Sequence, residues 1–408
     1  MQNQKSLYLF SICSAEGNMV NSYKSFYKFI GLHTFLIGLF PFYIPMFLWK
    51  LNYSISEISF FISLTGLGYC LTLWFWDRLH KKASLQKMVQ LSFLLELLLL
   101  ITVFASHKII FLPILALLYG AYNCFFWITN RVLFFEIVTP SNSGKNFGNF
   151  QIVVSIILKI GVFCGGFLLD RYSYLSIFIF SSLVAILSVA SFANGQHIGQ
   201  LSPSLLQIKA IRLSSIIQFK DDYRSKLVFS IDGLFLYLES FFWVITLFLI
   251  VHESFWQLGM LVIVLMAIFG VVFFLIKNRI DRMPSRIVYQ TSVVLYILSW
   301  FLRGLLNEEI DLPVLFLLLV LITFFTSLFR LSFNKRFFDL ARTTTQQPYI
   351  LFKSYYSQFF IAVLFGLIGL FLLTVDDAKQ GMRYTYFTAG VVALGYFFYR
   401  SNKLTGKS

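Results

Sequence analysis

Long apolar runs separated by short polar segments follow one another along almost the whole chain. A helix that crosses a bilayer needs about 20 consecutive, mostly apolar residues, because each residue rises only about 1.5 Å through a core roughly 30 Å thick. Twelve runs approach or reach this length: residues 26–49, 58–76, 88–106, 109–129, 150–169, 174–192, 227–251, 255–276, 287–305, 314–333, 350–373 and 384–399. The pattern predicts an all-α polytopic membrane protein with about twelve transmembrane helices.

A long polar segment divides these runs into six and six. We expect an N-terminal six-helix half at residues 1–193, a linker at 194–226 and a C-terminal six-helix half at 227–408. Within the linker, residues 205–219 are amphipathic enough to predict a short helix on the membrane surface. In the first apolar run, Pro41 and Pro45 should bend the helix, because each removes a backbone hydrogen bond.

The composition agrees with a membrane protein and excludes a soluble globular one. The chain has 408 residues, of which 58% are hydrophobic and only 12% are charged, whereas soluble domains have roughly 25% charged residues. The net charge is +15, but the basic residues lie in short loops between apolar runs rather than in a patch on a soluble module. Nucleic-acid binding is therefore not expected.

The loops on the two sides of the membrane differ in charge. One set carries most of the Lys and Arg residues, and the opposite set carries acidic clusters at Glu308, Glu309, Asp311, Asp376 and Asp377. Cytoplasmic loops of membrane proteins have an excess of positive charge. The asymmetry predicts an inner (cell) membrane protein with both termini and the linker in the cytoplasm.

Residue patterns typical of catalysis or cofactor binding are missing from the sequence. The four cysteines form no C-x-x-C pair, so neither a metal site nor a disulfide is expected. There is no phosphate-binding G-x-x-x-x-G-K-[ST] loop and no H-E-x-x-H pattern. We therefore expect that the protein is not an enzyme, needs no cofactor and does not hydrolyse ATP itself.

The loop after the second apolar run resembles a motif of the major facilitator superfamily. The family pattern is Gly-x-Leu-x-Asp-Arg-x-Gly-Arg/Lys-Arg/Lys, and this chain supplies four of its charged positions: Asp77, Arg78, Lys81 and Lys82. It departs from the pattern at three positions: Leu73, Phe75 and His80. The end of the eighth run, Lys277-Asn278-Arg279-Ile280-Asp281-Arg282, is a loose second copy.

The resemblance implies a secondary transporter in which two similar six-helix halves give alternating access to a central site. It also implies a gating role for the loop, because a carboxylate at a helix end can pair with cations and with a neighbouring helix N-terminus. Asp77 is the stronger candidate for this role and Asp281 the weaker one. Plain topology charge is the alternative interpretation of both loops.

Gly161, Gly165 and Gly166 lie in the fifth run. Exporters of the superfamily often have a Gly-x-x-x-Gly-Pro pattern here, and this chain has glycine in place of the proline. Small residues four apart also allow two helices to pack closely. The stripe is consistent with an exporter, and close packing alone explains it equally well.

Four charged residues lie within apolar runs, where each costs on the order of 2.5–3.5 kcal/mol and marks a functional candidate. They are Glu96, Lys159, Asp232 and Glu239. Other basic residues lie nearer the ends of runs and could reach water along their side chains: Lys28, Arg131, Arg330 and Lys353.

The resemblance implies that the first, fourth, seventh and tenth helices line the cavity. Glu239 and Asp232 are then the proton-coupling candidates, and Lys159 could reach the cavity and pair with a carboxylate. Glu96 would be a packing or lipid-interface residue on a peripheral helix. The uncharged candidates for lining the cavity are His33, Tyr119, Tyr122, Asn123, Trp127, Tyr237, Trp243, Thr326, Tyr356 and Gln358, for each of which simple packing is the alternative.

The function that we expect is proton-coupled efflux of an amphipathic small molecule or antibiotic-like compound by a monomer in the lipid bilayer. A carboxylate in a low-dielectric site favours its neutral form, so it can bind and release a proton near neutral pH. The alternatives within the transporter class are a flippase of a lipid or lipid-linked molecule and a metabolite importer. A non-transporting membrane receptor or scaffold is the alternative from another class.

Overall fold

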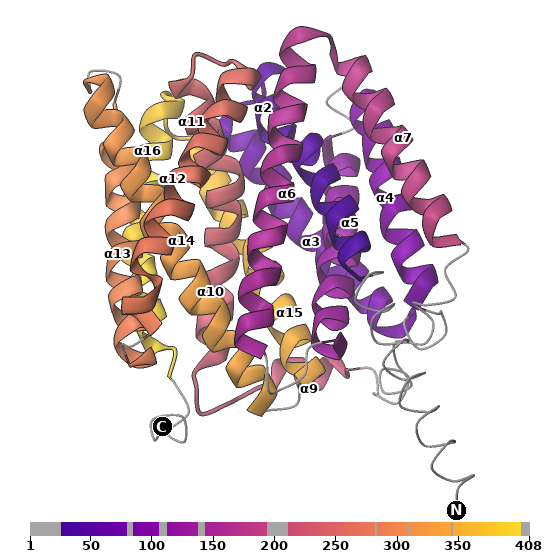
Figure 1. Ribbon diagram of the computed structural model, residues 1–408, viewed down its shortest axis with the longest axis vertical. Coiled ribbons are helices and arrows are strands. Elements are labelled where there is room, and N and C mark those ends of the chain that lie inside the picture. The colour runs from indigo at the N-terminus through magenta and orange to yellow at the C-terminus, as the bar shows by residue number, and fades with distance from the viewer. Residues whose placement is uncertain are drawn as a thin grey trace, which may run out of the picture.

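The computed structural model describes residues 26–79, 85–105, 112–137, 143–193, 211–281, 284–307, 310–343 and 346–400. In these ranges all regular structure is helical, and the long helices lie side by side in one bundle (Figure 1). The first half consists of residues 26–39 with η1 (Pro41–Tyr43) and α2 (Ile44–Lys50), then α3 (Ile55–Leu79), α4 (Leu85–Ala105), α5 (Leu112–Ile137), α6 (Ser143–Arg171) and α7 (Tyr174–Ala193).

The second half follows the short helix α9 (Leu213–Ile217). It consists of α10 (Ser225–Tyr237) continued by η4 (Leu238–Phe242) and α11 (Trp243–Ile250), then α12 (Phe255–Asp281), α13 (Ser285–Leu305), α14 (Leu312–Thr343), α15 (Gln346–Leu372), and α16 (Ala378–Val392) with η5 (Ala393–Phe398). Eleven of the described helices are long and apolar enough to span a membrane, and α16 with η5 forms the twelfth, shorter one. The predicted fold class is confirmed.

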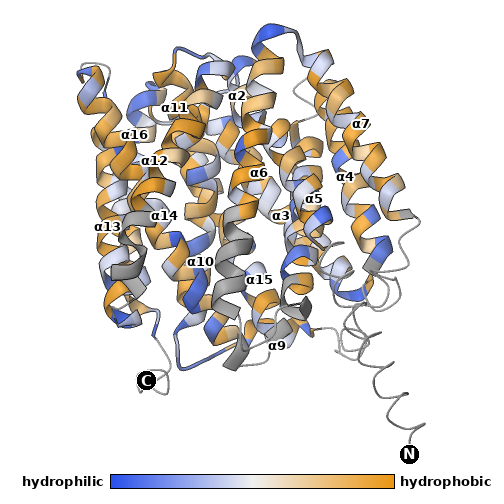
Figure 2. Ribbon diagram, viewed as in Figure 1, coloured by the Kyte–Doolittle hydropathy of each residue, from blue (hydrophilic) through white to orange (hydrophobic). Residues whose placement is uncertain are grey.

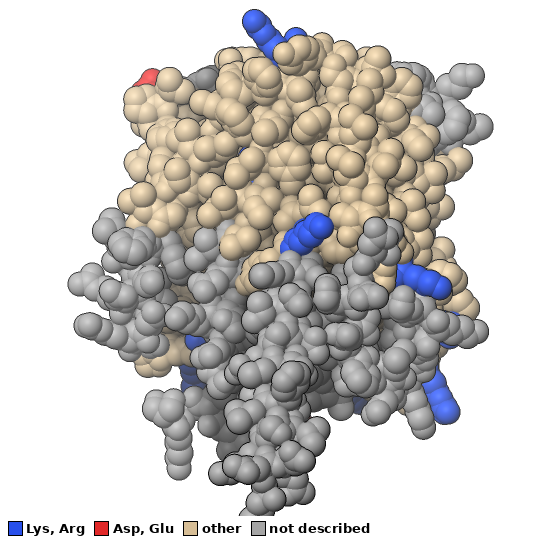
Figure 3. Space-filling view, turned by 45° about the vertical axis from the view of Figure 1, so that its right-hand side comes forward, with Lys and Arg blue, Asp and Glu red and all other residues tan. Residues whose placement is uncertain are grey.

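The outer surface of the bundle is apolar, as lipid contact requires. Large hydrophobic side chains are strongly exposed, among them Leu71 at 68%, Leu187 at 66% and Leu373 at 65%. Figure 2 shows hydrophobic residues along the middle of the helices and hydrophilic ones mostly toward their ends. On the face drawn in Figure 3, the described surface has a broad uncharged region, with Lys and Arg side chains above and below it.

The most extensive contacts between the halves are made by two helix pairs: α3 packs along α15, and α6 packs along α12. α15 also packs along α10 within its own half. Glycines permit both approaches of α15. A Cβ on Gly66 of α3 would lie 2.7 Å from the Gln358 carbonyl oxygen, and one on Gly233 of α10 would collide with the Ser357 carbonyl oxygen.

The expected bend in the first helix is present. The α-helix of residues 26–39 ends before Phe40, a 3-10 turn follows at η1, and the α-helical pattern resumes in α2. Pro41 and Pro45 occupy the first positions of η1 and α2, where a missing N–H does least harm. The seventh span contains a feature that the sequence did not predict, the π-helical turn η4 between α10 and α11.

The linker contains a helix that is shorter than expected. α9 has five residues, all at least partly exposed, and residues 205–210 of the expected helix lie outside the described residues. The segment rests against α15, since the Tyr356 hydroxyl donates to the Ile216 carbonyl and the Phe219 ring stacks on Phe352 at 4.5 Å. The cytoplasmic placement of this linker stays a prediction.

Candidate functional site

A network of charged side chains is buried inside the C-terminal half. Asp232 of α10 and Glu239 of η4 are seven residues apart, so both point to the same side of the seventh span. Arg330 of α14 lies between them: its Nη1 is 2.8 Å from Asp232 Oδ1, and its Nε is 3.0 Å from Glu239 Oε2. One guanidinium therefore bridges two carboxylates with charge-assisted hydrogen bonds.

Asp232 is the sealed end of the network. It is fully buried, and Lys353 Nζ of α15 lies 3.2 Å from its Oδ2. The Tyr396 hydroxyl donates to Oδ1 at 2.9 Å. Two cations and one hydroxyl thus stabilise this carboxylate in its ionised form, which is what a buried charge requires.

Glu239 is the accessible end. It has one cation, Arg330, and one hydroxyl donor, Tyr296 of α13. The Glu239 and Arg330 side chains are each 18% exposed. The carboxylate also lies in the π-helical turn, an irregularity that is frequent at functional sites.

Arg303 is another buried cation of this half. It is 2% exposed and lies over the rings of Trp243, at 4.7 Å, and Trp300, at 4.3 Å. Its guanidinium donates to Ser299 and Thr326 at 2.9 Å and 2.8 Å, and it forms no ion pair with any residue that the structure describes. Trp243 and Thr326, expected to line the cavity, thus contact this guanidinium.

The structure pairs the two carboxylates of the seventh span with residues other than Lys159, whose role at the cavity stays a prediction. Both carboxylates of the seventh span are occupied by Arg330 and Lys353, and Lys159 of α6 is half-buried without an ion pair in the described part of the chain. The partners are instead Arg330 and Lys353, two basic residues that were expected to reach water near the ends of their helices.

A second polar cluster, in the N-terminal half, contains Glu96 and agrees with the packing interpretation of this residue rather than with a place at the lipid interface. This residue is 1% exposed and faces the interior of its half rather than lipid. Its Oε2 lies 3.0 Å from His33 Nδ1, and the Tyr122 hydroxyl donates to its Oε1 at 3.3 Å. His33 and Tyr122, expected as cavity-lining residues, thus belong to this buried cluster.

Aromatic rings meet where the two halves face each other. The Phe241 ring of η4 lies 5.9 Å from Phe61 of α3, 5.9 Å from Tyr119 of α5 and 5.4 Å from Tyr237. Phe241 is two residues from Glu239, so the two side chains leave opposite sides of the same π-helical turn: the ring faces the N-terminal half, and the carboxylate faces α13 and α14.

A family model described as the Major Facilitator Superfamily matches residues 29–251, more than half of the chain. The protein belongs to the Major Facilitator Superfamily. No curated relative matches its sequence significantly.

Solved structures of the superfamily share the fold. The nucleoside transporter NupG is 14% identical with a TM-score of 0.67, and the match covers 93% of this chain and 99% of that one. A mutant of the same transporter is 13% identical with a TM-score of 0.68, at 92% and 100% coverage. A bacterial homologue of the human drug peptide transporters PepT1 and PepT2 is 10% identical with a TM-score of 0.61, at 93% and 97% coverage.

The superfamily motif after the second span contacts the linker. Asp77 is 1% exposed, and its Oδ2 accepts a hydrogen bond from the Ile211 backbone N–H at 2.8 Å. Arg78 is exposed and turns back to its own helix, with its guanidinium 3.7 Å from the Trp74 ring centroid. Lys81 and Lys82 lie outside the described residues, and so does the side chain of Asp281.

Further contacts between the halves lie at both ends of this superfamily member. On the linker side, Arg131 Nη1 of α5 donates to Ser354 Oγ of α15 at 3.2 Å. At the other end, Asp170 at the end of α6 accepts from Ser254 Oγ at 2.7 Å and from the Trp256 N–H at 2.8 Å, at the start of α12.

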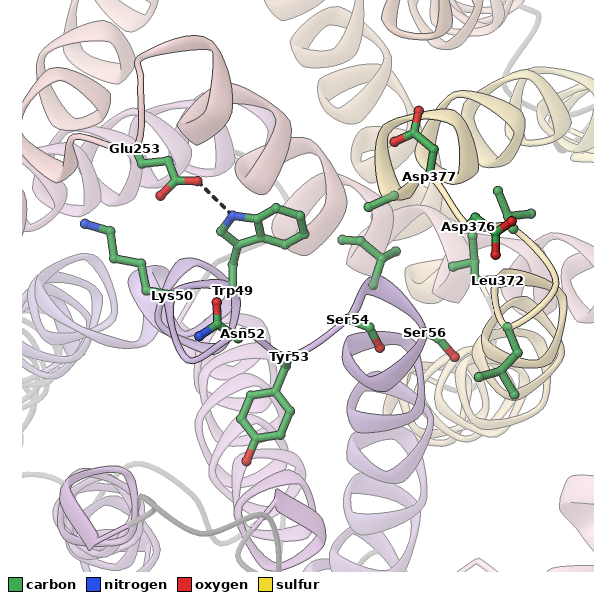
Figure 4. Close-up of a pocket in the computed structure, with 14 residues that line it drawn as sticks. Trp49, Lys50, Asn52, Tyr53, Ser54, Ser56, Glu253, Leu372, Asp376 and Asp377 are labelled. Carbon is green, nitrogen blue, oxygen red and sulfur yellow. Dashed lines mark hydrogen bonds between the residues drawn. The ribbon is translucent and has the colours of Figure 1, made fainter.

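A pocket of about 840 Å³ opens at that second end. Figure 4 shows Trp49 at its edge, with the indole directed at Glu253, and Asp376 and Asp377 on the opposite side. The pocket is therefore lined from both halves by polar side chains, at one entrance to the interface between them.

The remaining expected lining residues have local contacts. Asn123 Nδ2 donates to the Tyr119 carbonyl of its own helix at 2.8 Å, and the Trp127 ring packs on Phe126. Tyr356 binds the linker, and Gln358 is 7% exposed at the contact between α3 and α15. Their roles in substrate binding stay predictions.

Proposed function

We propose that this protein is a proton-coupled secondary transporter in which Glu239 binds the coupling proton. The observation that carries the proposal is the unequal pairing of the two carboxylates on the seventh span. Asp232 has two cations and no exposed surface, whereas Glu239 shares one cation and is 18% exposed. A carboxylate with fewer partners and access to solvent exchanges a proton at lower cost.

Protonation of Glu239 changes the contact between two helices. The neutral carboxyl no longer attracts the Arg330 guanidinium strongly, and Arg330 then rests on Asp232 alone. Since Arg330 belongs to α14 and Glu239 to η4, the proton weakens one link between the seventh and tenth spans. A ligand shifts a conformational equilibrium by its differential affinity for the two states, and this link is the element that a proton acts on.

The substrate that we propose is an amphipathic small molecule with a ring system. Phe61, Tyr119, Tyr237 and Phe241 offer ring faces at the boundary between the halves. Aromatic side chains stack on flat apolar groups, and the Glu239–Arg330 pair, which is partly exposed on the other side of the same π-helical turn, offers polar contacts. The proposed direction is export in exchange for protons. The molecule would enter the transporter from the membrane lipid.

The sequence signal for export has a second, structural explanation. An added Cβ on Gly161 or Gly165 of α6 would collide with the carbonyl oxygens of Phe35 or Leu39 in the first helix. The glycine stripe thus supports close packing of these helices, and the proposed direction rests on the substrate chemistry. Import of a ring-bearing metabolite is the second candidate, because the similar structures include a nucleoside transporter.

Inside-out membrane vesicles separate the two directions. A respiration-driven, acid-inside gradient is followed with a fluorescent amine, and amphipathic ring compounds or nucleosides are added from outside. Export predicts that an amphipathic compound releases protons from vesicles with the wild-type protein but not from vesicles with Glu239→Gln. The matched control is Asp222→Asn, at an exposed carboxylate before α10, which should behave as wild type. Proton-driven nucleoside uptake into right-side-out vesicles, without response to any amphipathic compound in inside-out ones, would reject export.

A further inference from the structure

The polar cluster of the N-terminal half is sealed from its surroundings. His33 of helix 26–39, Ser92 and Glu96 of α4, and Tyr122 of α5 are each at most 1% exposed. Rings of Phe93 and Phe126 lie 4.3 Å from the imidazole. The cluster is as deeply buried as Asp232, although no family motif or sequence spacing brings these residues together.

One ring nitrogen of the imidazole contacts Ser92. The Ser92 hydroxyl lies 2.7 Å from the Val89 carbonyl oxygen and 3.0 Å from His33 Nε2. Its single proton can serve either neighbour, so the tautomer of the ring decides which atom donates between Ser92 and Nε2. The other ring nitrogen, Nδ1, faces Glu96 Oε2 at 3.0 Å.

The other two facing atoms, His33 Nδ1 and Glu96 Oε2, are 3.0 Å apart but lack a well-aligned hydrogen bond. An ionised carboxylate without a well-placed donor is costly in a low-dielectric site. Binding a proton on the carboxyl group or on the imidazole changes that cost, so this pair is a place where a proton can bind and leave.

Charged groups on the surrounding helices are few. α7 contains no charged residue, and Lys87 of α4 and Arg131 of α5 are more than two helical turns from Glu96 and Tyr122 along their helices. Lys28, on the helix of His33, lies over the Phe192 ring at 5.5 Å. α6 packs on the helix of His33 at Gly31 and Gly38 and carries Lys159 in this segment. Tyr122 is the remaining titratable group in contact with Glu96 among the described residues.

The same three helix positions supply a similar arrangement in both halves. His33, Glu96 and Tyr122 come from the first, third and fourth spans, and Glu239, Tyr296 and Arg330 come from the seventh, ninth and tenth. In each case a carboxylate accepts from a tyrosine hydroxyl and faces a nitrogen base or cation. The two halves of the transporter thus each contain a carboxylate in the same kind of setting.

We propose that His33 and Glu96 form a second proton-binding site of this transporter. The ligand is a proton bound on the Glu96 carboxyl group or the His33 imidazole, and Tyr122 positions the carboxylate. Tyr122 lies behind Tyr119, with ring centroids 6.3 Å apart, and Tyr119 contacts Phe241 across the halves. Movement of the halves, or a molecule between these rings, shifts Tyr122 and changes how firmly Glu96 holds the proton. The site is independent of Glu239, but its use in transport rests on the proposed proton coupling.

Infrared difference spectroscopy of the reconstituted protein tests the site without a substrate. The probe is the proton itself: pH is stepped between about 5 and about 9, a range that spans the ordinary histidine value, and the carboxyl C=O bands are recorded. The wild type should show a pH-dependent carboxyl band that is absent in Glu96→Gln and present in Glu239→Gln and in the control Asp222→Asn. An identical set of bands in wild type and Glu96→Gln would overturn the proposal.

A second variant covers a failure of Glu96→Gln to fold. His33→Gln keeps a polar side chain beside Ser92 but removes the imidazole that faces Glu96. It should shift the pH midpoint of the Glu96 carboxyl band by about one unit or more. No shift would overturn the proposal. If instead Glu239 has no coupling role, the outcome differs. Glu239→Gln would then transport like the wild type, and the Glu96 band would still behave as predicted.

Discussion

Trp49 and Glu253 join the two halves at the end of the molecule remote from the linker. The indole Nε1 of Trp49, at the end of the first span, donates to Glu253 Oε1, after the seventh span, at 3.1 Å. Lys50 extends the contact, with its ammonium 4.6 Å from the Phe255 ring centroid. At the opposite end, Arg131 of α5 donates to Ser354 of α15 between the halves, and Asp77 binds the linker at Ile211. Alternating access requires that such contacts break in turn.

Replacing Glu253 should loosen the first of these ends. Glu253→Ala removes the acceptor for Trp49, and we expect a larger fraction of molecules to open on this side. The measurement is the rate at which a thiol reagent labels a cysteine introduced at Ser56, a residue that lines the adjacent pocket. Labelling should be several-fold faster than with Glu253 intact. Equal rates would show that this hydrogen bond does not contribute to closure.

Replacing Asp77 should impair transport more than replacing Asp281. Asp77→Asn weakens the charge-assisted bond to the Ile211 N–H, worth roughly 1.5–3 kcal/mol, and releases the linker from the second span. Asp281→Asn is the matched variant at the equivalent loop of the other half. Substrate flux per molecule, at equal amounts in the membrane, is the measurement. Wild-type flux through Asp77→Asn would remove the proposed gating role.

The orientation of the bundle makes a separate prediction. The charge asymmetry of the loops predicts that the linker lies in the cytoplasm. A cysteine at Asp222, which is exposed before α10, should resist a membrane-impermeant thiol reagent in intact cells and react with it in inside-out vesicles. A cysteine at Asp311, on the other side, should show the opposite pattern, and a reversal of both would overturn the orientation.

Replacing Asp232, the fully buried carboxylate, should lower the stability of the protein and not only its coupling. In Asp232→Asn the buried Lys353 ammonium loses its carboxylate partner, and Arg330 keeps only its contact with Glu239. Breaking a buried pair in this way costs about 3–5 kcal/mol. We expect a lower thermal unfolding temperature in detergent, with partial recovery in Asp232→Asn combined with Lys353→Met. A single variant as stable as wild type would contradict the anchoring role of Asp232.

The sequence predicted the spans, the bend at Pro41 and the two carboxylates of the seventh span because each depends on local composition. It missed their partners for a physical reason. The apolar run around Arg330 ends at residue 333, but α14 continues to Thr343, so Arg330 lies well inside the helix and cannot reach water at its end. Lys353 likewise lies two turns inside α15, which begins at Gln346.

The sequence left two places open for Glu96, packing and the lipid interface, because spacing along a helix does not tell which face points inward. Its helix is nearly uniformly apolar, so the pattern gives no preferred direction, and its partner His33 is 63 residues away in the sequence. The π-helical turn around Glu239 was also beyond prediction. A single inserted residue in a helix leaves no distinct mark in an apolar stretch.

The most direct test of the account is transport by Glu239→Gln in proteoliposomes, measured in two modes with the same substrate. Glutamine keeps the size of the side chain and a hydrogen bond from Tyr296 but cannot bind or release a proton. We predict that transport driven by a pH gradient is lost, while exchange of substrate across the membrane without a gradient continues near the wild-type rate. Gradient-driven transport at the wild-type rate by folded Glu239→Gln would contradict the central claim.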